Sequence, residues 1–310
     1  MVSTGSSLEP KQLPSGRAMS NGVNLLPLVS IITPSLNQGR FIRDTIESVL
    51  SQDYPRLEYL VMDGGSTDET LDILRSYGDQ LTWRSRPDGG QAAAVNSGVR
   101  LAKGEILGWL NSDDTYQPGA VTAAVEHLIA HPETAVVYGD AHYIDEQNRV
   151  IGIYPTEDFA LDRLAHACLI CQPTAFFRRT AIEAVGVLDA SLQYCMDYDL
   201  WIRLGRLFPL KRIPGFLANS RQYPQTKTWS QRDRLFTELC VVTQRSFGFT
   251  SPHWRVWHAY ARLKGVSWPI ARSVLYPVKA VLPERASRWL RVTLPLMINR
   301  LIFWNLRARR

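Results

Sequence analysis

Five polar side chains of this 310-residue chain lie at or just beyond the carboxyl ends of predicted strands. They are Thr33, Asp63, Asp88, Asn111 and Asp113. The carboxyl ends of parallel strands meet at one edge of a sheet, so we expect these side chains to converge there. Carboxylates at such an edge can accept hydrogen bonds from a nucleobase or a ribose. One of them can also hold a divalent cation that neutralises a diphosphate.

The glycine-rich loops that usually hold phosphates are absent from the sequence. No GxGxxG follows a predicted strand, and GxxxxGK[ST] does not occur. The acidic edge therefore indicates another arrangement, in which Mg²⁺ or Mn²⁺ contributes to binding the diphosphate.

The elements that position these side chains alternate between strand and helix. Val29–Ser35 (VSIITPS) is a β-branched apolar run, typical of a buried parallel strand. In the segment that follows, Ile42, Ile46 and Val49 recur at the spacing of one helical face. Four more stretches are predicted to be strands, namely residues 57–62, 81–86, 105–110 and 172–178.

The repeated strand–helix order sets the fold class. It predicts an α/β chain with a doubly wound, mostly parallel sheet and helices on both faces. Ser66 and Glu69 have the S-x-x-E spacing of a capping box, which predicts that the second helix starts there. A later helix is predicted from MDYDLWIRL, with Leu200, Trp201 and Leu204 facing inward.

Length and composition limit the class of protein further. A hydrophobic content of 45% supports a sizeable core and excludes a wholly disordered chain. Four cysteines without a secretory signal favour a reducing compartment, and the C-x-x-C of Cys168 and Cys171 indicates core thiols. Three segments are predicted: a disordered lead-in at 1–26, an α/β domain at 27–250 with halves at about 27–116 and 117–250, and a helical extension at 251–310.

Four stretches together resemble the family 2 glycosyltransferases, which have the GT-A fold. They are VSIITPSLNQGRFIRDTIESVLSQDYP, EYLVMDGGSTDET, PDGGQAAAVNSGVRLAKGEILGWLNSDD and MDYDLWIRL. The stretches occur in the family's order, and the likeness covers roughly residues 28 to 230. The resemblance implies an inverting transferase that uses a nucleoside diphosphate sugar as donor.

The resemblance also implies roles for the residues of the nucleotide-sugar half. Thr33 lies beside the base, Asp63 accepts a hydrogen bond from it, and Asp88 supports the same nucleoside. The NSDD segment looks like the family's D-x-D element, with Asn111 in the first acidic place, near the ribose, and Asp113 in the second. Asp113 is then the ligand of Mg²⁺ or Mn²⁺. Asn111 departs from the family pattern and removes one negative charge.

The acceptor half is similar to the family in carrying an acid before a helix. The family's general base belongs to an acidic pair there; Met196 stands in the first place and Asp197 in the second. The resemblance therefore implies that Asp197 is the base, and the positive end of the helix keeps such a carboxylate ionised. Asp197 could also be a helix N-cap. Asp199 is expected to pair with Arg203 instead.

Downstream, SRQYPQTKTW resembles the stretch in which the family offers a basic residue to the diphosphate. Arg221 and Lys227 are the candidates, and Tyr223 stands where the family often has His. Gln172 is expected either to line the acceptor pocket or to be a strand-end amide bonded to backbone.

The mechanism implied is a single displacement with inversion, in cell-surface polysaccharide or glycolipid assembly. Two other classes remain open. A sugar-phosphate nucleotidyltransferase shares the α/β plan but should carry a Gly-rich basic loop, which TPSLNQGR matches poorly. A non-catalytic membrane- or partner-binding module explains the basic tail and leaves the crevice motifs unexplained.

The last 60 residues differ in charge from the rest of the chain. Residues 251–310 hold 12 Lys and Arg and one acid, a local charge of +11, whereas 23 basic and 28 acidic residues precede them. This asymmetry indicates an anionic partner. No base-reading module is evident, so we expect a membrane surface rather than nucleic acid.

We therefore predict peripheral binding to the inner face of the cell membrane, next to a lipid-linked acceptor. The apolar side chains expected to enter the interface are Trp257, Trp268, Trp289, Leu290, Leu301, Ile302, Phe303 and Trp304. The alternative is that these residues pack a small helical subdomain.

Overall fold

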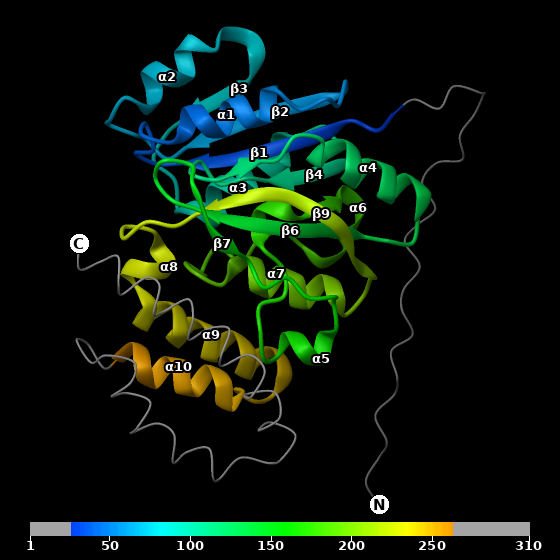
Figure 1. Ribbon diagram of the computed structural model, residues 1–310, viewed down its shortest axis with the longest axis vertical. Coiled ribbons are helices and arrows are strands. Elements are labelled where there is room, and N and C mark those ends of the chain that lie inside the picture. The colour runs from blue at the N-terminus through cyan, green and yellow to red at the C-terminus, as the bar shows by residue number, and fades with distance from the viewer. Residues whose placement is uncertain (1–25, 263–310) are drawn as a thin grey trace, which may run out of the picture. The chain divides into compact units, whose positions relative to one another are not determined.

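A computed structural model describes residues 26–262 of the chain (Figure 1). Its strands are β1 (Val29–Ser35), β2 (Leu57–Asp63), β3 (Thr82–Ser85), β4 (Ile106–Trp109), β5 (Thr115–Tyr116), β6 (Val136–Ile144), β7 (Val150–Ile153), β8 (Phe176–Arg178) and β9 (Leu210–Arg221). Its α-helices are α1 (Ile42–Leu50), α2 (Thr70–Ser76), α3 (Gln91–Leu101), α4 (Ala120–Ala130), α5 (Leu161–Leu164), α6 (Arg179–Val185), α7 (Met196–Gly205), α8 (Lys227–Ser230), α9 (Arg232–Phe247) and α10 (Pro252–Arg262). Two 3₁₀ turns, η1 (Gly78–Gln80) and η2 (Gln172–Thr174), complete the described elements.

The strands form one mixed sheet in the order β3-β2-β1-β4-β8-β6-β9-β5, with β7 paired to β6. The four strands β3, β2, β1 and β4 are parallel, in agreement with the predicted, mostly parallel sheet. Beyond β4, β8 runs antiparallel to both β4 and β6, while β6 and β9 are parallel. In the parallel half, Ser35 pairs with Asp63, so these two strands end side by side.

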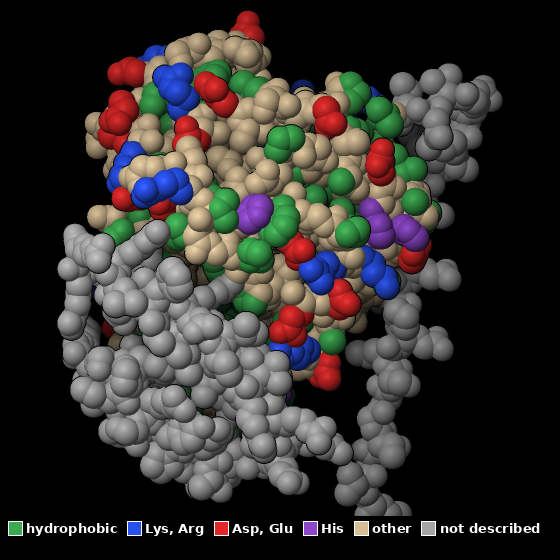
Figure 2. Space-filling view, in the orientation of Figure 1, with side chains coloured by type: hydrophobic (Ala, Val, Ile, Leu, Met, Phe, Trp, Pro, Cys, Tyr) green, Lys and Arg blue, Asp and Glu red, His purple; other side chains and the backbone are tan. Residues whose placement is uncertain are grey.

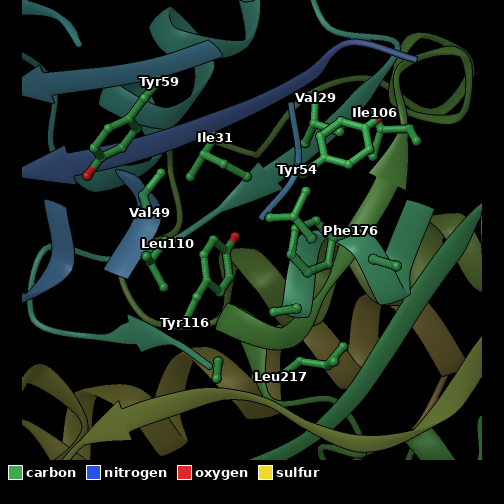
Figure 3. Close-up of a cluster of buried hydrophobic side chains, with 14 of the residues drawn as sticks. Val29, Ile31, Val49, Tyr54, Tyr59, Ile106, Leu110, Tyr116, Phe176 and Leu217 are labelled. Carbon is green, nitrogen blue, oxygen red and sulfur yellow. The ribbon is translucent and has the colours of Figure 1, made fainter. Parts of the chain in front are cut away.

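Helices cover both faces of the sheet, as the alternating pattern predicts. On one face, α1, α2 and α4 pack over a cluster that includes Val29, Ile31 and Phe176 (Figure 3). The Tyr116 and Phe176 rings stack within this cluster, with their centroids 5.3 Å apart. On the other face, α3 packs on β1 and β2. A Cβ at Gly98 of α3 would lie 2.4 Å from the Ile32 side chain, so glycine permits this close approach.

Two local predictions are wrong in informative ways. Residues 172–178 form η2 followed by the short strand β8, because Pro173 has no N–H to offer a strand ladder. The capping box is absent as well. The Ser66 hydroxyl donates to the Asp63 carboxylate, a charged acceptor, and α2 begins only at Thr70. Asp68 accepts from the Thr70 backbone N–H at 3.0 Å instead.

The chain divides into two compact units, Met1–Thr226 and Lys227–Arg310. The sequence analysis predicted the end of the α/β domain at residue 250, before a helical extension. The division falls earlier because α9 packs against α10. None of the helices within residues 26–262 has the length and apolar character needed to cross a membrane.

The second unit tests one residue of the predicted membrane-facing set. Trp257 is buried, and its ring stacks on Phe236 with a centroid distance of 6.1 Å. Trp254 is also buried beside Phe236. The expectation that Trp257 enters a membrane is therefore wrong, because this side chain packs the helical unit. The other apolar residues named for the membrane, from Trp268 to Trp304, lie outside the described residues, as does the lead-in up to residue 25.

Candidate active site

The centre of the candidate site is the turn Asn111–Asp114 between β4 and β5. The turn is fixed at both ends by the core, because Leu110 before it and Tyr116 after it are buried (Figure 3). The Asp114 backbone N–H donates to the Asn111 carbonyl at 3.1 Å and closes the turn. From α1, the Thr45 hydroxyl donates to the Asp114 carbonyl at 2.7 Å. The turn therefore presents its side chains from a rigid base.

The two neighbouring carboxylates of this turn differ in accessibility. Asp114 is buried, and its Oδ1 accepts from the Arg221 backbone N–H at 2.8 Å. Asp113 is partly exposed, and its Oδ2 accepts from the Tyr223 hydroxyl at 2.9 Å. Burial raises the pKa of Asp113, and burial together with the Asp113 charge raises the pKa of Asp114 well above its usual range. Asp113 is thus the carboxylate of this pair that a ligand can reach.

Arg221 lies beneath this turn. Its side chain is fully buried and bonds the Asp113 carbonyl at 2.7 Å and the Asp145 carbonyl at 3.0 Å, while Asp44 lies 3.2 Å away. The guanidinium also stacks 4.6 Å from the Phe41 ring centre. Its N–H groups are directed at protein acceptors, so a contact with a diphosphate would require them to leave these partners. Lys227, the other basic candidate, begins α8 in the second unit.

The buried Arg221 leads to a prediction about stability. We expect Arg221→Lys to lower the free energy of unfolding by about 2–4 kcal/mol, because an ammonium cannot satisfy the separated acceptors that the planar guanidinium reaches. Denaturant unfolding measures the change. The matched control is Arg212→Lys, since Arg212 pairs with Asp140 at 2.7 Å and its side chain is 34% exposed. Figure 2 shows that acidic and basic side chains intermix on the visible face of the molecule. For this control we expect less than about 1 kcal/mol. Equal losses for the two variants would contradict the prediction.

Amide side chains surround the first residue of the turn. Asn111 Oδ1 accepts from Gln91 Nε2 at 2.7 Å and from Trp109 Nε1 at 2.9 Å. Asn111 Nδ2 donates to Gln172 Oε1 at 2.9 Å and to Asp114 Oδ2 at 3.3 Å. Gln172 Nε2 in turn donates to the Trp109 carbonyl at 2.5 Å. Gln172 therefore makes the hydrogen bond to backbone that one of its two interpretations predicted. Asn111 could contact a ribose only by giving up one of its four hydrogen bonds.

The predicted nucleoside side of the site lies at the ends of β1 and β2. Asp63 is buried, and its carboxylate accepts from the Gly65 and Ser66 backbone N–H groups and from the Ser66 and Ser85 hydroxyls. Thr33 is also buried and accepts from the Tyr59 hydroxyl at 3.1 Å. The strand ends bring these residues together, but both side chains already have partners in the protein.

Asp88 is the exposed acid on this side. Its Oδ1 accepts from the Gly90 backbone N–H at 2.7 Å, at the start of α3. A Cβ at Gly64 would lie 3.3 Å from Asp88 Oδ2, so the loops after β2 and β3 touch. The structure therefore places Asp88 beside the loop that follows Asp63, as the convergence of strand ends predicts.

Asp197 lies in the first turn of α7. It is the second residue of the helix and is partly exposed, and its Oδ1 accepts from the Tyr198 backbone N–H at 2.8 Å. Cys195 occupies the N-cap position, so Asp197 is not the N-cap. Burial and the nearby Asp197 charge raise the pKa of the Cys168 thiol to about 12. The predicted pairing of Asp199 with Arg203 is confirmed at 2.8 Å.

Comparison with known proteins supplies the deciding observation. The profile of the family described as Glycosyl transferase family 2 matches residues 30–186, just over half of the 310 residues. The chain belongs to this family. The matched part contains β2 to β4, all of β1 except Val29, the Asn111–Asp114 turn and Gln172.

Relatives of this family 2 protein extend the match. An uncharacterized glycosyltransferase of Rickettsia prowazekii is 31% identical over 208 residues, which cover 63% of this chain and 64% of that protein. Chondroitin synthase of Escherichia coli is 31% identical over 198 residues, 63% of this chain and 29% of that protein. The chain thus spans less than two thirds of the length of these relatives.

A solved structure agrees with the fold. The mannosyltransferase PcManGT of Pyrobaculum calidifontis, in complex with GDP-Man and Mn²⁺, has a TM-score of 0.59 and 19% identity, and the match covers 91% of this chain and 84% of that one. The predicted α/β fold of GT-A type is therefore confirmed.

The carboxylates of this family 2 site suit a divalent cation whose other ligands come from a substrate. Among residues 26–262, no group of three or more His, Cys, Asp and Glu side chains is arranged to hold a metal. Mg²⁺ and Mn²⁺ sites at phosphates often use only one or two carboxylates, with phosphate oxygens and water as the other ligands. The accessible Asp113 next to the buried Asp114 fits this kind of site.

Sequence reasoning missed one residue that positions the acceptor half. Asn96, buried in α3, donates to the Leu188 carbonyl at 2.8 Å and accepts from the Leu188 backbone N–H at 2.9 Å. It thereby fixes the loop that leads into α7 and Asp197. An Asn among the Ala and Val residues of a buried helical face was the available signal, since a buried amide needs polar partners.

The four cysteines, all of which lie in the described part of the chain, form no disulfide. Cys171 is buried and Cys168 is partly exposed.

Proposed function

We propose that this protein transfers a sugar from a nucleoside diphosphate sugar to an acceptor hydroxyl, with inversion at the anomeric carbon. The observation that carries the proposal is the partly exposed Asp113 on the Asn111–Asp114 turn. Asn111 bonds this turn to Gln91, which follows the Asp88 loop, and that loop touches the one after Asp63. Membership of family 2 supports it. The complex of the mannosyltransferase neighbour with GDP-Man and Mn²⁺ supports a donor and a cation of this kind.

In the proposed reaction, Asp197 accepts the proton of the acceptor hydroxyl. The freed oxygen attacks the anomeric carbon from the face opposite the diphosphate, which leaves as the nucleoside diphosphate. When bound at Asp113, Mg²⁺ or Mn²⁺ neutralises the charge that develops on this leaving group. Asp197 is well placed for proton transfer because it is partly exposed and lies in the first turn of a helix.

The remaining predicted roles belong to this proposal. Thr33, Asp63 and Asp88 contact the nucleoside, directly or through the serine hydroxyls that bond Asp63. Gln172 borders the acceptor pocket. Lys227 is the basic candidate for the diphosphate, whereas Arg221 acts by holding the Asp113 carbonyl.

The test is a panel of UDP, GDP, ADP and dTDP sugars, incubated with the purified protein and Mn²⁺. Release of nucleoside diphosphate from one donor supports the proposal, and NMR of the product reports whether the configuration inverts. Release of inorganic diphosphate from a nucleoside triphosphate and a sugar phosphate would instead identify a nucleotidyltransferase. No turnover with any donor, with or without oligosaccharide acceptors, would contradict the proposal.

The biological context we propose is assembly of a cell-surface polysaccharide or glycolipid at the inner face of the cell membrane. The likeness to chondroitin synthase supports a polysaccharide product. The charge of +11 over residues 251–310 supports an anionic surface as partner.

Membrane binding has its own expected result. At low ionic strength the full chain is expected to float with vesicles that contain about 30% anionic lipid. Each basic side chain near the surface should contribute about 1 kcal/mol to the free energy of binding. High salt and purely zwitterionic vesicles should abolish flotation, because the attraction is electrostatic. A chain that stays unbound to anionic vesicles at low salt would contradict the prediction.

A further inference from the structure

Asn111 stands in the first acidic place of the motif, and its amide is saturated with hydrogen bonds. A carboxamide can accept two bonds at its oxygen and donate two from its nitrogen. Asn111 accepts from Gln91 and Trp109 and donates to Gln172 and Asp114, all within 3.3 Å. Nothing in its bonding capacity is left for a ligand.

A carboxylate in place of this amide would lose the two hydrogen bonds that the amide nitrogen donates. In an Asn111→Asp variant, the second oxygen would face Gln172 Oε1 and Asp114 Oδ2, which are both acceptors. Gln172 cannot rotate its amide to help, because its Nε2 donates to the Trp109 carbonyl. The new negative charge would also lie 3.3 Å from the Asp114 carboxylate, where two like charges repel each other.

The partners of Asn111 come from three separate parts of the fold. Gln91 is the first residue of α3, directly after the Asp88 loop. Gln172 opens η2, in the predicted acceptor half. Asp114 belongs to the turn itself and bonds the Arg221 backbone. A single amide therefore connects the nucleoside side, the acceptor half and the carboxylate turn.

We propose that Asn111 is a positioning residue whose amide holds Gln172 and Gln91 against the carboxylate turn, and that it does not bind the donor or the cation itself. This inference rests on the proposed function, since positioning matters only for the reaction proposed above. The amide is required in this role. Restoring the acid that the motif lacks should therefore impair the enzyme.

The experiment compares Asn111→Asp, Gln172→Ala and the double variant with wild type. Turnover is measured with the donor that wild type uses, and calorimetry measures binding of Mn²⁺ with the matching nucleoside diphosphate. We expect N111D to lower turnover about tenfold or more, as for loss of buried hydrogen bonds. Binding of Mn²⁺ and nucleotide should stay within about threefold of wild type in Q172A, which changes no charge. In N111D it should stay within about tenfold, because the added charge acts on the cation only through space. The double variant should be no slower than the slower single variant, since both changes break one connection.

The matched control is Gln147→Glu, which adds the same charge at an exposed position and keeps the acceptor for Arg149. We expect its turnover to equal that of wild type. Thermal melting shows whether each variant is folded. If N111D does not fold, Q172A alone carries the test, with the same loss of turnover at unchanged binding.

Several outcomes would overturn the inference. Turnover of N111D equal to or above that of wild type would overturn it. Binding of Mn²⁺ and nucleotide more than tenfold tighter than in wild type would overturn it too, since either result would assign residue 111 to the ligand set. Losses of N111D and Q172A that multiply in the double variant would show that the two residues act independently. A wild type without turnover refutes the proposed function, whereas an active wild type with an unimpaired N111D refutes this inference alone.

Discussion

Asp113→Asn is expected to lower sugar transfer at least ~100-fold and to abolish the Mn²⁺ dependence of nucleotide binding. The substitution keeps the size of the side chain and an oxygen that can accept from the Tyr223 hydroxyl, now 2.9 Å from Oδ2. It removes only the negative charge that would hold the cation. Transfer assays and calorimetry with and without Mn²⁺ measure the two effects, and excess EDTA should reproduce them in wild type.

The control for this variant is Asp53→Asn, an exposed acid that accepts from the Thr122 hydroxyl at 2.7 Å. It should leave both transfer and metal dependence unchanged. Full activity of wild type in excess EDTA would remove the metal from the proposal. Full activity of the Asp113 variant would remove Asp113 from the site.

Asp197→Asn is expected to lower transfer at least ~100-fold while nucleotide affinity stays within about twofold. The proposed role of Asp197 is to accept a proton from the acceptor, so the donor complex should form normally. The amide can still accept from the Tyr198 backbone N–H, which keeps the start of α7 intact. A rate assay at saturating donor, together with calorimetric titration of nucleotide, separates the two quantities.

Asp162→Asn, an exposed acid in the first turn of α5, is the matched control and should behave as wild type. If Asp197→Asn turned over at the wild-type rate, another group would have to be the base. Parallel losses of nucleotide affinity and rate would instead place Asp197 on the donor side.

The local order of elements could be read from the sequence because it depends on neighbours in the chain. The spacing of Ile42, Ile46 and Val49 gave the buried face of α1, and the apolar run Val29–Ser35 gave a strand that is buried throughout. The order of strands and helices then gave the parallel half of the sheet, because strand–helix–strand connections favour that topology. The convergence of the Asp63 and Asp88 loops followed from it.

What each polar side chain does was decided by partners that are distant in sequence. Ser66 has the spacing of a helix cap, yet Asp63, itself at a strand end, takes its hydroxyl. Arg221 has the sequence position of a diphosphate ligand, yet folding places its guanidinium under the Asp113 carbonyl, 108 residues away along the chain. No local pattern encodes such a pairing, because it depends on how β5, which follows the Asp113 turn, pairs with β9.

Asn111 shows the same division most clearly. Its position in a D-x-D-like element was evident from the NSDD segment alone, and so was its departure from an acid. The reason for the amide lies in Gln91 and Gln172, at sequence separations of 20 and 61 residues. The sequence by itself determined the family, the mostly parallel α/β class of the sheet and the candidate acids, since these follow from periodicity and motif spacing. Only the tertiary structure decided which of those side chains are exposed to a ligand and which are already held by the protein, because hydrogen-bond partners and burial arise from packing between distant segments.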